Sequence, residues 1–184
     1  AEVTVVLGPT ALGPNERGGL NVVDVVSAED MAREVLSRVD AADFLIAAAA
    51  VSDYRPKATS DQKTKKSEGP ETLTLVRTPD VLLEASRKVR AAPRRPLLVG
   101  FAAETSNVEA YAREKLVKKD LDWIVANDVT APGAGFGHDT NAVVCLSRGG
   151  ERQAMRGTKQ EVARGIWDLL IRYAAAGVDG AGGS

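Results

Sequence analysis

The chain has 184 residues, and its 24 Lys and Arg against 25 Asp and Glu give a formal net charge of -1, which argues against a nucleic-acid-binding protein. Its composition, 44% hydrophobic and 27% charged, is typical of a folded soluble domain, and no apolar run reaches the roughly 18 residues of a membrane helix. A single Cys and a single His exclude an internal disulfide framework and a His-cluster metal site.

Short apolar runs alternate with longer amphipathic segments, a pattern typical of βαβ units. The first run begins at Val3 with no export signal before it, so we expect a cytoplasmic protein. Strands are predicted at residues 3–7, 22–26, 44–49, 73–76, 97–101, 123–126 and 142–146. We predict an α/β, Rossmann-like three-layer fold with a mostly parallel sheet and a C-terminal antiparallel hairpin that turns at Arg148–Gly150.

Four segments have the pattern of helices. Ser27 begins a capping box for a helix that runs to about Val39. Thr158 caps the amphipathic C-terminal helix. Thr78 is expected to be an N-cap with Pro79 in the first helical position, and a further helix is predicted over 107–119. We expect one domain over residues 1–176 and a flexible Gly-rich tail over 177–184.

Long segments without regular structure are predicted at 8–20, 51–70 and 128–140. Ligands of open α/β sheets bind beyond the carboxyl ends of the strands, where such loops lie. The loop after residues 44–49 holds five cations between Arg55 and Lys66 and a single acid, Asp61. This composition suits a polyphosphate, or simply a solvated basic loop. Asp53 could hold a ribose hydroxyl or a metal ion, or act as a turn residue.

Further candidates follow other strands. The small residues 47–50 would let a flat ring lie on the strand end, or would only allow close packing. Asp80 stands at a helix start that offers free N–H groups. Phe101 is either a base-stacking platform or a core residue. Lys115 and Lys119 lie one helical turn apart, as in an anion site or a solvated face.

Two segments match familiar catalytic motifs only in part, and the single thiol is not expected to be reactive. Gly8 to Gly13 has the glycine spacing of a P-loop, but Pro14-Asn15 stand where Lys-Ser/Thr should be. Tyr111 and Lys115 match the Tyr-x-x-x-Lys pair of short-chain dehydrogenases, without that family's Ser or glycine-rich turn. Cys145 lies in an apolar strand and is expected to be an inert core thiol.

Six motifs taken in order resemble phosphopantothenoylcysteine synthetase over residues 1 to about 173. They are AAAVSDYRP at 48–56, KTKKS at 63–67, TPDVL at 78–82, VGFAAET at 99–105, AREKL at 112–116 and ANDV at 126–129. The resemblance implies a Rossmann-like domain, usually a homodimer, that joins 4'-phosphopantothenate to cysteine. In the bacterial family CTP activates the carboxylate as an acyl-cytidylate with help from Mg²⁺ or Mn²⁺, and cysteine then displaces CMP.

The resemblance also implies roles for particular residues. Ala47, Ala48 and Ala49 would line the cytosine pocket, and Asp53 would contact the nucleotide and is the candidate metal ligand. Lys63 would neutralise the triphosphate as the catalytic residue. The remaining nucleotide-binding positions would be Pro79, Asp80, Val81, Leu82, Phe101, Lys115 and Lys119. Lysines, backbone and metal can support such chemistry without a catalytic His.

Family members begin about forty residues earlier, with a strand, a Gly-Gly-Thr turn and an Ile-Ser-Asn-x-Ser-Ser-Gly segment, none of which is in this sequence. A flavin-dependent decarboxylase domain, to which the family's domain is often fused, is also outside it. The first hypothesis is therefore a CTP-dependent ligase domain. The alternatives are a nucleotide-binding module without turnover and a short-chain NAD(P)-dependent dehydrogenase.

Overall fold

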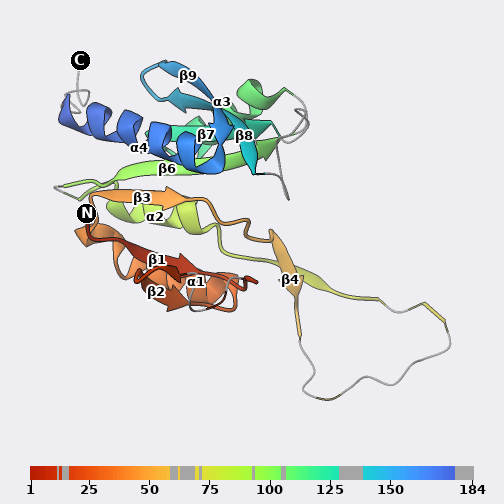
Figure 1. The fold of residues 1–184 in the computed structure, drawn as a ribbon. Coiled ribbons are helices and arrows are strands. Elements are labelled where there is room, and N and C mark those ends of the chain that lie inside the picture. Colours follow the sequence, from red (N-terminus) through yellow and green to blue (C-terminus); the bar gives the residue numbers. More distant parts are fainter. Residues whose placement is uncertain are drawn as a thin grey trace. The chain divides into compact units, whose positions relative to one another are not determined.

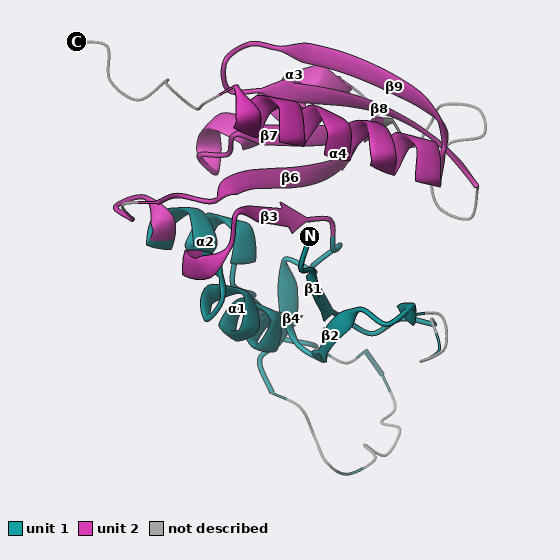
Figure 2. Cartoon of the chain, turned by 60° about the vertical axis from the view of Figure 1, so that its left-hand side comes forward, with its two compact units in different colours: residues 1–39, 49–88 teal, residues 40–48, 89–184 magenta. Residues whose placement is uncertain are grey.

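The computed structural model describes residues 1–11, 13, 17–58, 62, 69–70, 72–92, 94–104, 107–128 and 139–176. The chain divides into two compact units (Figure 2). Unit 1 comprises residues 1–39 and 49–88, and unit 2 comprises residues 40–48 and 89–184. In the part of the chain that is described, no helix combines the length and apolar character needed to cross a bilayer.

The described part of unit 1 contains two small sheets and two α-helices. Strands β1 (Thr4–Leu7) and β2 (Asn21–Asp24) pair in parallel, and β4 (Tyr54–Pro56) and β5 (Leu75–Arg77) form an antiparallel ribbon (Figure 1). Helix α1 (Ala28–Leu36) follows β2, and α2 (Val81–Val89) follows β5.

The capping box of α1 confirms the prediction at Ser27. The Asp30 N–H donates to Ser27 Oγ over 3.0 Å, and the Ser27 N–H donates to Asp30 Oδ2 over 3.2 Å. Helix α1 ends at Leu36, and a short 3₁₀ turn covers Val39–Ala41. The helix is therefore shorter than predicted, because the chain tightens before it enters the next strand.

Acidification is expected to weaken this cap. Hydrogen bonds from Ser27 and then Arg33 lower the pKa of Asp30 from 3.8 to about 2. A lowered folded-state pKa gives stability that is present above pH 3.8 and is lost as the pH falls toward 2. An NMR titration of the Asp30 carboxyl should show this pKa, and Ser27→Ala should move it back toward 3.8. An identical titration in both proteins would contradict the assignment.

Unit 2 is built on a five-stranded sheet in the order β3-β6-β7-β8-β9. Its strands are β3 (Phe44–Ala47), β6 (Leu97–Glu104), β7 (Trp123–Asp128), β8 (Thr140–Ser147) and β9 (Arg152–Thr158). The first three are parallel, and β8 and β9 add an antiparallel hairpin. The predicted α/β class, with its parallel sheet and C-terminal hairpin, is confirmed.

Helices α3 (Val108–Lys118) and α4 (Lys159–Ala175) cover opposite faces of this sheet, which gives unit 2 three layers. Alternation along the strands decides which side chain meets which helix. Val99, Trp123 and Val125 pack with Ile166 and Leu170 of α4. The residues between them face the other side, where α3 buries its Ala112 and Leu116. The predicted capping box at Thr158 and Glu161 is confirmed.

A cluster of charged residues around the buried Asp122 joins the amino ends of β6 and β7 in unit 2. Asp122, 8% exposed, accepts a hydrogen bond from the Leu98 N–H over 2.7 Å and lies 3.4 Å from Arg95. Arg148 donates to the Leu121 carbonyl over 3.1 Å and pairs with Asp120. Burial raises the pKa of Asp122, while the Leu98 N–H and Arg95 oppose that rise. The cluster fastens two strands at the end of the sheet opposite the predicted ligand edge.

Candidate functional site

In unit 1 the structure brings Asp53 to the start of α2. The Thr78 N–H donates to the Asp53 carbonyl over 3.0 Å, and the Thr78 hydroxyl donates to the Ser52 carbonyl. Ser52 Oγ in turn donates to the Tyr54 carbonyl over 2.9 Å. The segment that carries Asp53 is thereby fastened to the segment that carries Pro79 and Asp80.

Thr78 is not the N-cap of α2, so that prediction is wrong. Asp80 caps the helix: the Leu83 N–H donates to Asp80 Oδ1 over 3.2 Å, and the Glu84 N–H donates to the Asp80 carbonyl over 2.9 Å. The Thr78 hydroxyl donates to the carbonyl of Ser52, just before β4, instead, and the helix begins at Val81. Asp80 is exposed, and Leu82 packs inward at 9% exposure.

The small residues after β3 lie where the sequence predicts a flat ligand. Strand β3 ends at Ala47 rather than at Ala49, because the chain leaves the ladder with Gly100 as its last partner. Ala47 is half-buried, whereas Ala48 and Ala49 are exposed. Backbone near Ala48 and Ala49 is therefore open to a ligand, which the predicted role requires.

Phe101 and the two lysines of α3 belong to opposite faces of the sheet of unit 2. The Phe101 ring, 38% exposed, lines a pocket with Val162 and Trp167 on the α4 side. Lys115 is exposed in the second half of α3, and Lys119 is the C-cap of that helix. The structure thus does not gather these three side chains on one face, and Lys119 directly precedes Asp120, which lies at the amino ends of β6 and β7, opposite the predicted ligand edge.

The basic loop is the main part of the candidate site that lies outside the described residues. Lys63, Lys65 and Lys66 fall in the range 63–68, so the predicted catalytic role of Lys63 stays a prediction. The tail over 177–184 is likewise outside. At the flank of the loop, Lys57 is exposed, and its N–H donates to the Thr74 carbonyl over 2.9 Å. The β4–β5 ribbon therefore holds together the two chain segments that lead into and out of the loop.

Cys145 is an inert core thiol, as predicted. Its side chain is 1% exposed, and burial raises its pKa to about 11. A thiol with such a pKa is not ionised at neutral pH, so it offers neither a nucleophile nor a metal ligand.

The described residues contain no cluster of three or more His, Cys, Asp or Glu that could hold a metal ion. Asp53 is an exposed carboxylate without two further acids beside it. A Mg²⁺ ion that is held mostly by the phosphates of a nucleotide needs only one or two protein carboxylates. A lone carboxylate such as Asp53 suits an ion whose other ligands come from a bound phosphate, and the described residues offer no cage for a resident ion.

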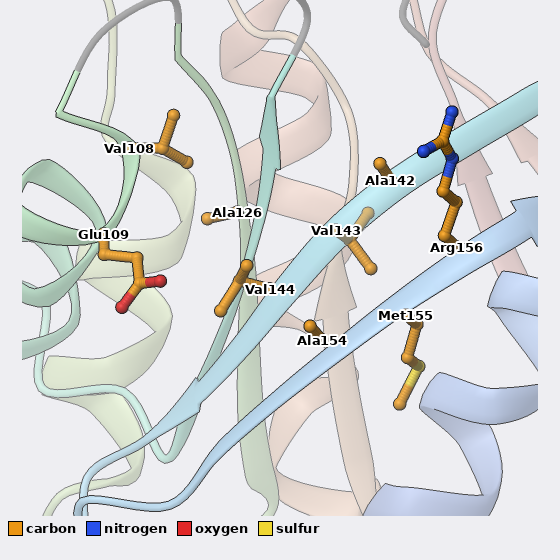
Figure 3. Close-up of a pocket in the computed structure, with 9 residues that line it drawn as sticks. All are labelled: Val108, Glu109, Ala126, Ala142, Val143, Val144, Ala154, Met155 and Arg156. Carbon is orange, nitrogen blue, oxygen red and sulfur yellow. The ribbon is translucent and has the colours of Figure 1, made fainter. Parts of the chain in front are cut away.

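A groove of about 400 Å³ lies on the α3 face of unit 2 (Figure 3), and no sequence motif predicts it. Small side chains make its floor, among them Ala126, Val144 and Ala154, and Glu109 and Arg156 lie on opposite sides of it. Glu109 is held by Arg152, whose Nη2 lies 2.6 Å from Glu109 Oε1. None of the predicted site residues lines this groove.

Comparison with known proteins identifies the family of the chain. Residues 1–173 match the family described as DNA/pantothenate metabolism flavoprotein C-terminal domain. The chain is 46% identical over 155 residues to the coenzyme A biosynthesis bifunctional protein CoaBC of Bacillus subtilis, covering 84% of this chain and 37% of that protein. It is 39% identical over 177 residues to CoaBC of Escherichia coli, covering 94% and 42%.

Among solved structures, the chain is similar to the crystal structure of the C-terminal domain of CoaBC. The TM-score is 0.74 at 36% identity, and the match covers 95% of this chain and 76% of the other. The chain spans less than half the length of these two curated relatives. With the family match over nearly the whole sequence and the same fold, the chain belongs to the family of DNA/pantothenate metabolism flavoprotein C-terminal domains.

Proposed function

We propose that this chain is the phosphopantothenate–cysteine ligase domain of a coenzyme A biosynthesis protein. The observation that carries the proposal is the match of residues 1–173 to one family, together with relatives that are named for coenzyme A biosynthesis. Those relatives are described as bifunctional and extend well beyond the match. We therefore propose that the second activity, a flavin-dependent decarboxylase, belongs to the same longer protein. A cytoplasmic location also stays a prediction.

The proposed reaction has two steps. A carboxylate oxygen of 4'-phosphopantothenate attacks the α-phosphorus of CTP, which forms an acyl-cytidylate and releases pyrophosphate. The amine of cysteine then attacks the acyl carbon, and CMP leaves as the amide bond forms. Both steps place negative charge on phosphate oxygens, so fixed cations and hydrogen-bond donors are the groups that would accelerate them.

The candidate residues fit this division of labour. Asp53 and the start of α2 are tied together through Thr78, which makes one prepared surface for the nucleotide in unit 1. Lys63 would neutralise the triphosphate, and Asp53 would take one position on a Mg²⁺ ion that the phosphates carry. When bound, that ion would withdraw charge from the leaving pyrophosphate. Ala47 to Ala49 would present backbone groups to the base.

We also propose that the protein works as a homodimer through the β4–β5 ribbon. An isolated two-stranded ribbon is marginally stable in water. This one exposes Tyr54 at 49% and Leu75 at 51%, and Leu73, just before β5, is 66% exposed, a pattern that favours burial against another chain. Sedimentation equilibrium of the full-length protein tests this: a mass of two chains supports it, and a monomer at micromolar concentration contradicts it.

The catalytic proposal is tested by pyrophosphate release from the full-length encoded protein. Release should require 4'-phosphopantothenate, CTP and Mg²⁺, and amide formation should additionally require cysteine. Binding of CTP without any pyrophosphate would favour a nucleotide-binding module. Preference for NADPH over CTP in a thermal-shift measurement would instead favour the dehydrogenase alternative.

A further inference from the structure

The groove on the α3 face of unit 2, called the α3 groove below, is not used by any of the roles given above. Helix α3 packs mainly against β7, so β9 lies beyond the cover of this helix. The groove follows this uncovered part of the sheet, with the first turn of α3 on one side and β9 on the other (Figure 3). Its volume of about 400 Å³ falls within the range of about 300–1,000 Å³ that is usual for small-molecule sites.

The floor of the α3 groove is flat because small side chains stand next to one another on it. Ala126, Val144 and Ala154 are direct cross-strand partners on β7, β8 and β9. Neighbouring strands lie about 4.8 Å apart, so these three side chains form an apolar strip about 10 Å long across the sheet. A planar ring system can lie on such a strip, whereas larger side chains would stand up from the sheet and fill the space.

The charges beside this floor are unequal. Arg152 reaches from β9 to Glu109 in the first turn of α3, with 2.6 Å between Nη2 and Oε1, and this hydrogen bond lowers the pKa of Glu109. The Glu109 carboxylate is therefore ionised and already neutralised. Arg156 lies opposite Ala142 in the β8–β9 ladder, is exposed, and makes no ion pair with the described residues. One guanidinium is therefore left over in the groove, and it is complementary to one negative charge on a ligand.

We infer that the α3 groove binds a flat apolar molecule that carries one carboxylate. The rings would lie on the strip of Ala126, Val144 and Ala154, and the carboxylate would accept hydrogen bonds from the Arg156 guanidinium. A second copy of the chain fits less well, because antiparallel pairing of β9 with itself would bring arginines of the two strands together. None of the residues proposed for ligation lines this groove, so the inference does not depend on the proposed function.

The charge of the ligand is tested with 2-naphthoate, and 2-naphthylmethanol, which has the same rings without the charge, serves as its control. In calorimetric titrations of the full-length protein, 2-naphthoate is expected to bind at least about tenfold more tightly than 2-naphthylmethanol. Arg156→Gln should remove this difference. Arg164→Gln, which changes an exposed arginine of α4 outside the groove, is the matched control and should preserve it.

The place of binding is tested by filling the floor. Ala154 is exposed on β9, and phenylalanine is well suited to strands, so Ala154→Phe should fold normally and cover the apolar strip. The Kd for 2-naphthoate should rise at least about tenfold. Gln153→Phe places the same ring one residue away, on the other face of the strand, and should change the Kd by less than about twofold. Thermal unfolding checks the fold of both variants.

Several results would overturn the assignment of this site. One is equal affinity for 2-naphthoate and 2-naphthylmethanol, or no binding of 2-naphthoate at millimolar concentration. Another is an unchanged Kd in Ala154→Phe, because the ligand would then lie elsewhere. Equal losses from Arg156→Gln and Arg164→Gln would also overturn it, since the total charge of the protein and not the groove would then set the affinity.

Discussion

Replacing Asp122 with Ala is expected to lower the free energy of unfolding by about 3 to 5 kcal/mol, the usual cost of breaking a buried charged pair. The carboxylate accepts a hydrogen bond from the Leu98 N–H over 2.7 Å and lies 3.4 Å from Arg95. Without it the buried Leu98 N–H loses its acceptor, and Arg95 keeps a partly buried charge without its partner. Urea denaturation of the full-length protein, followed by a probe in this domain, measures the effect.

Two further variants make this prediction specific. Asp122→Asn keeps an acceptor for Leu98 and should lose less stability than Asp122→Ala. Asp43→Ala removes an exposed carboxylate that pairs with Arg94 in the same unit, and it should cost less than about 1 kcal/mol. Equal losses from Asp43→Ala and Asp122→Ala would contradict the structural role given to the cluster.

Replacing Lys63 with Gln is expected to lower kcat for ligation by about 10² to 10³ and to leave the fold intact. The reason is chemical: pyrophosphate leaves with more charge than it carried in CTP, and an amide cannot neutralise that charge as an ammonium does. Steady-state kinetics on the full-length protein measure the change, and thermal unfolding checks the fold.

Lys57→Gln is the matched control for Lys63. This exposed lysine lies at the flank of the same basic segment, and its backbone N–H, which holds the ribbon, is unaffected by the substitution. It should change kcat by less than about threefold, since a solvated surface charge has a small effect. Equal effects at both positions would show that the loop acts through its total charge and would contradict a specific role for Lys63.

Features that depend on neighbouring residues could be predicted from the sequence. The capping boxes at Ser27 and Thr158 form as expected, because their partners stand three residues away. The predicted hairpin that turns at Arg148–Gly150 also forms, because its turn residues directly connect the two strands that pair. Strand β4 was missed and falls in a predicted loop, because it has three residues and pairs with a strand about twenty positions later.

Features that depend on distant partners could not be predicted. Thr78 has the sequence pattern of an N-cap, but its hydroxyl donates to the Ser52 carbonyl, 26 positions earlier in the chain. The Asp122 cluster joins residues 95, 98, 122 and 148, which come from three separate segments of the chain. Phe101 and Lys115 lie on opposite faces of one sheet. Strand alternation and the side on which each helix packs decide this, and the order of the six motifs carries no information about either.

The path of the carboxylate oxygen tests the central claim most directly. The full-length protein is given CTP, Mg²⁺, cysteine and 4'-phosphopantothenate that carries ¹⁸O in its carboxylate, and the phosphate of the released CMP is analysed by mass spectrometry. An acyl-cytidylate predicts one ¹⁸O atom in each CMP and none in pyrophosphate. Product formation with unlabelled CMP, or with the label in inorganic phosphate beside CDP, would contradict the proposed reaction.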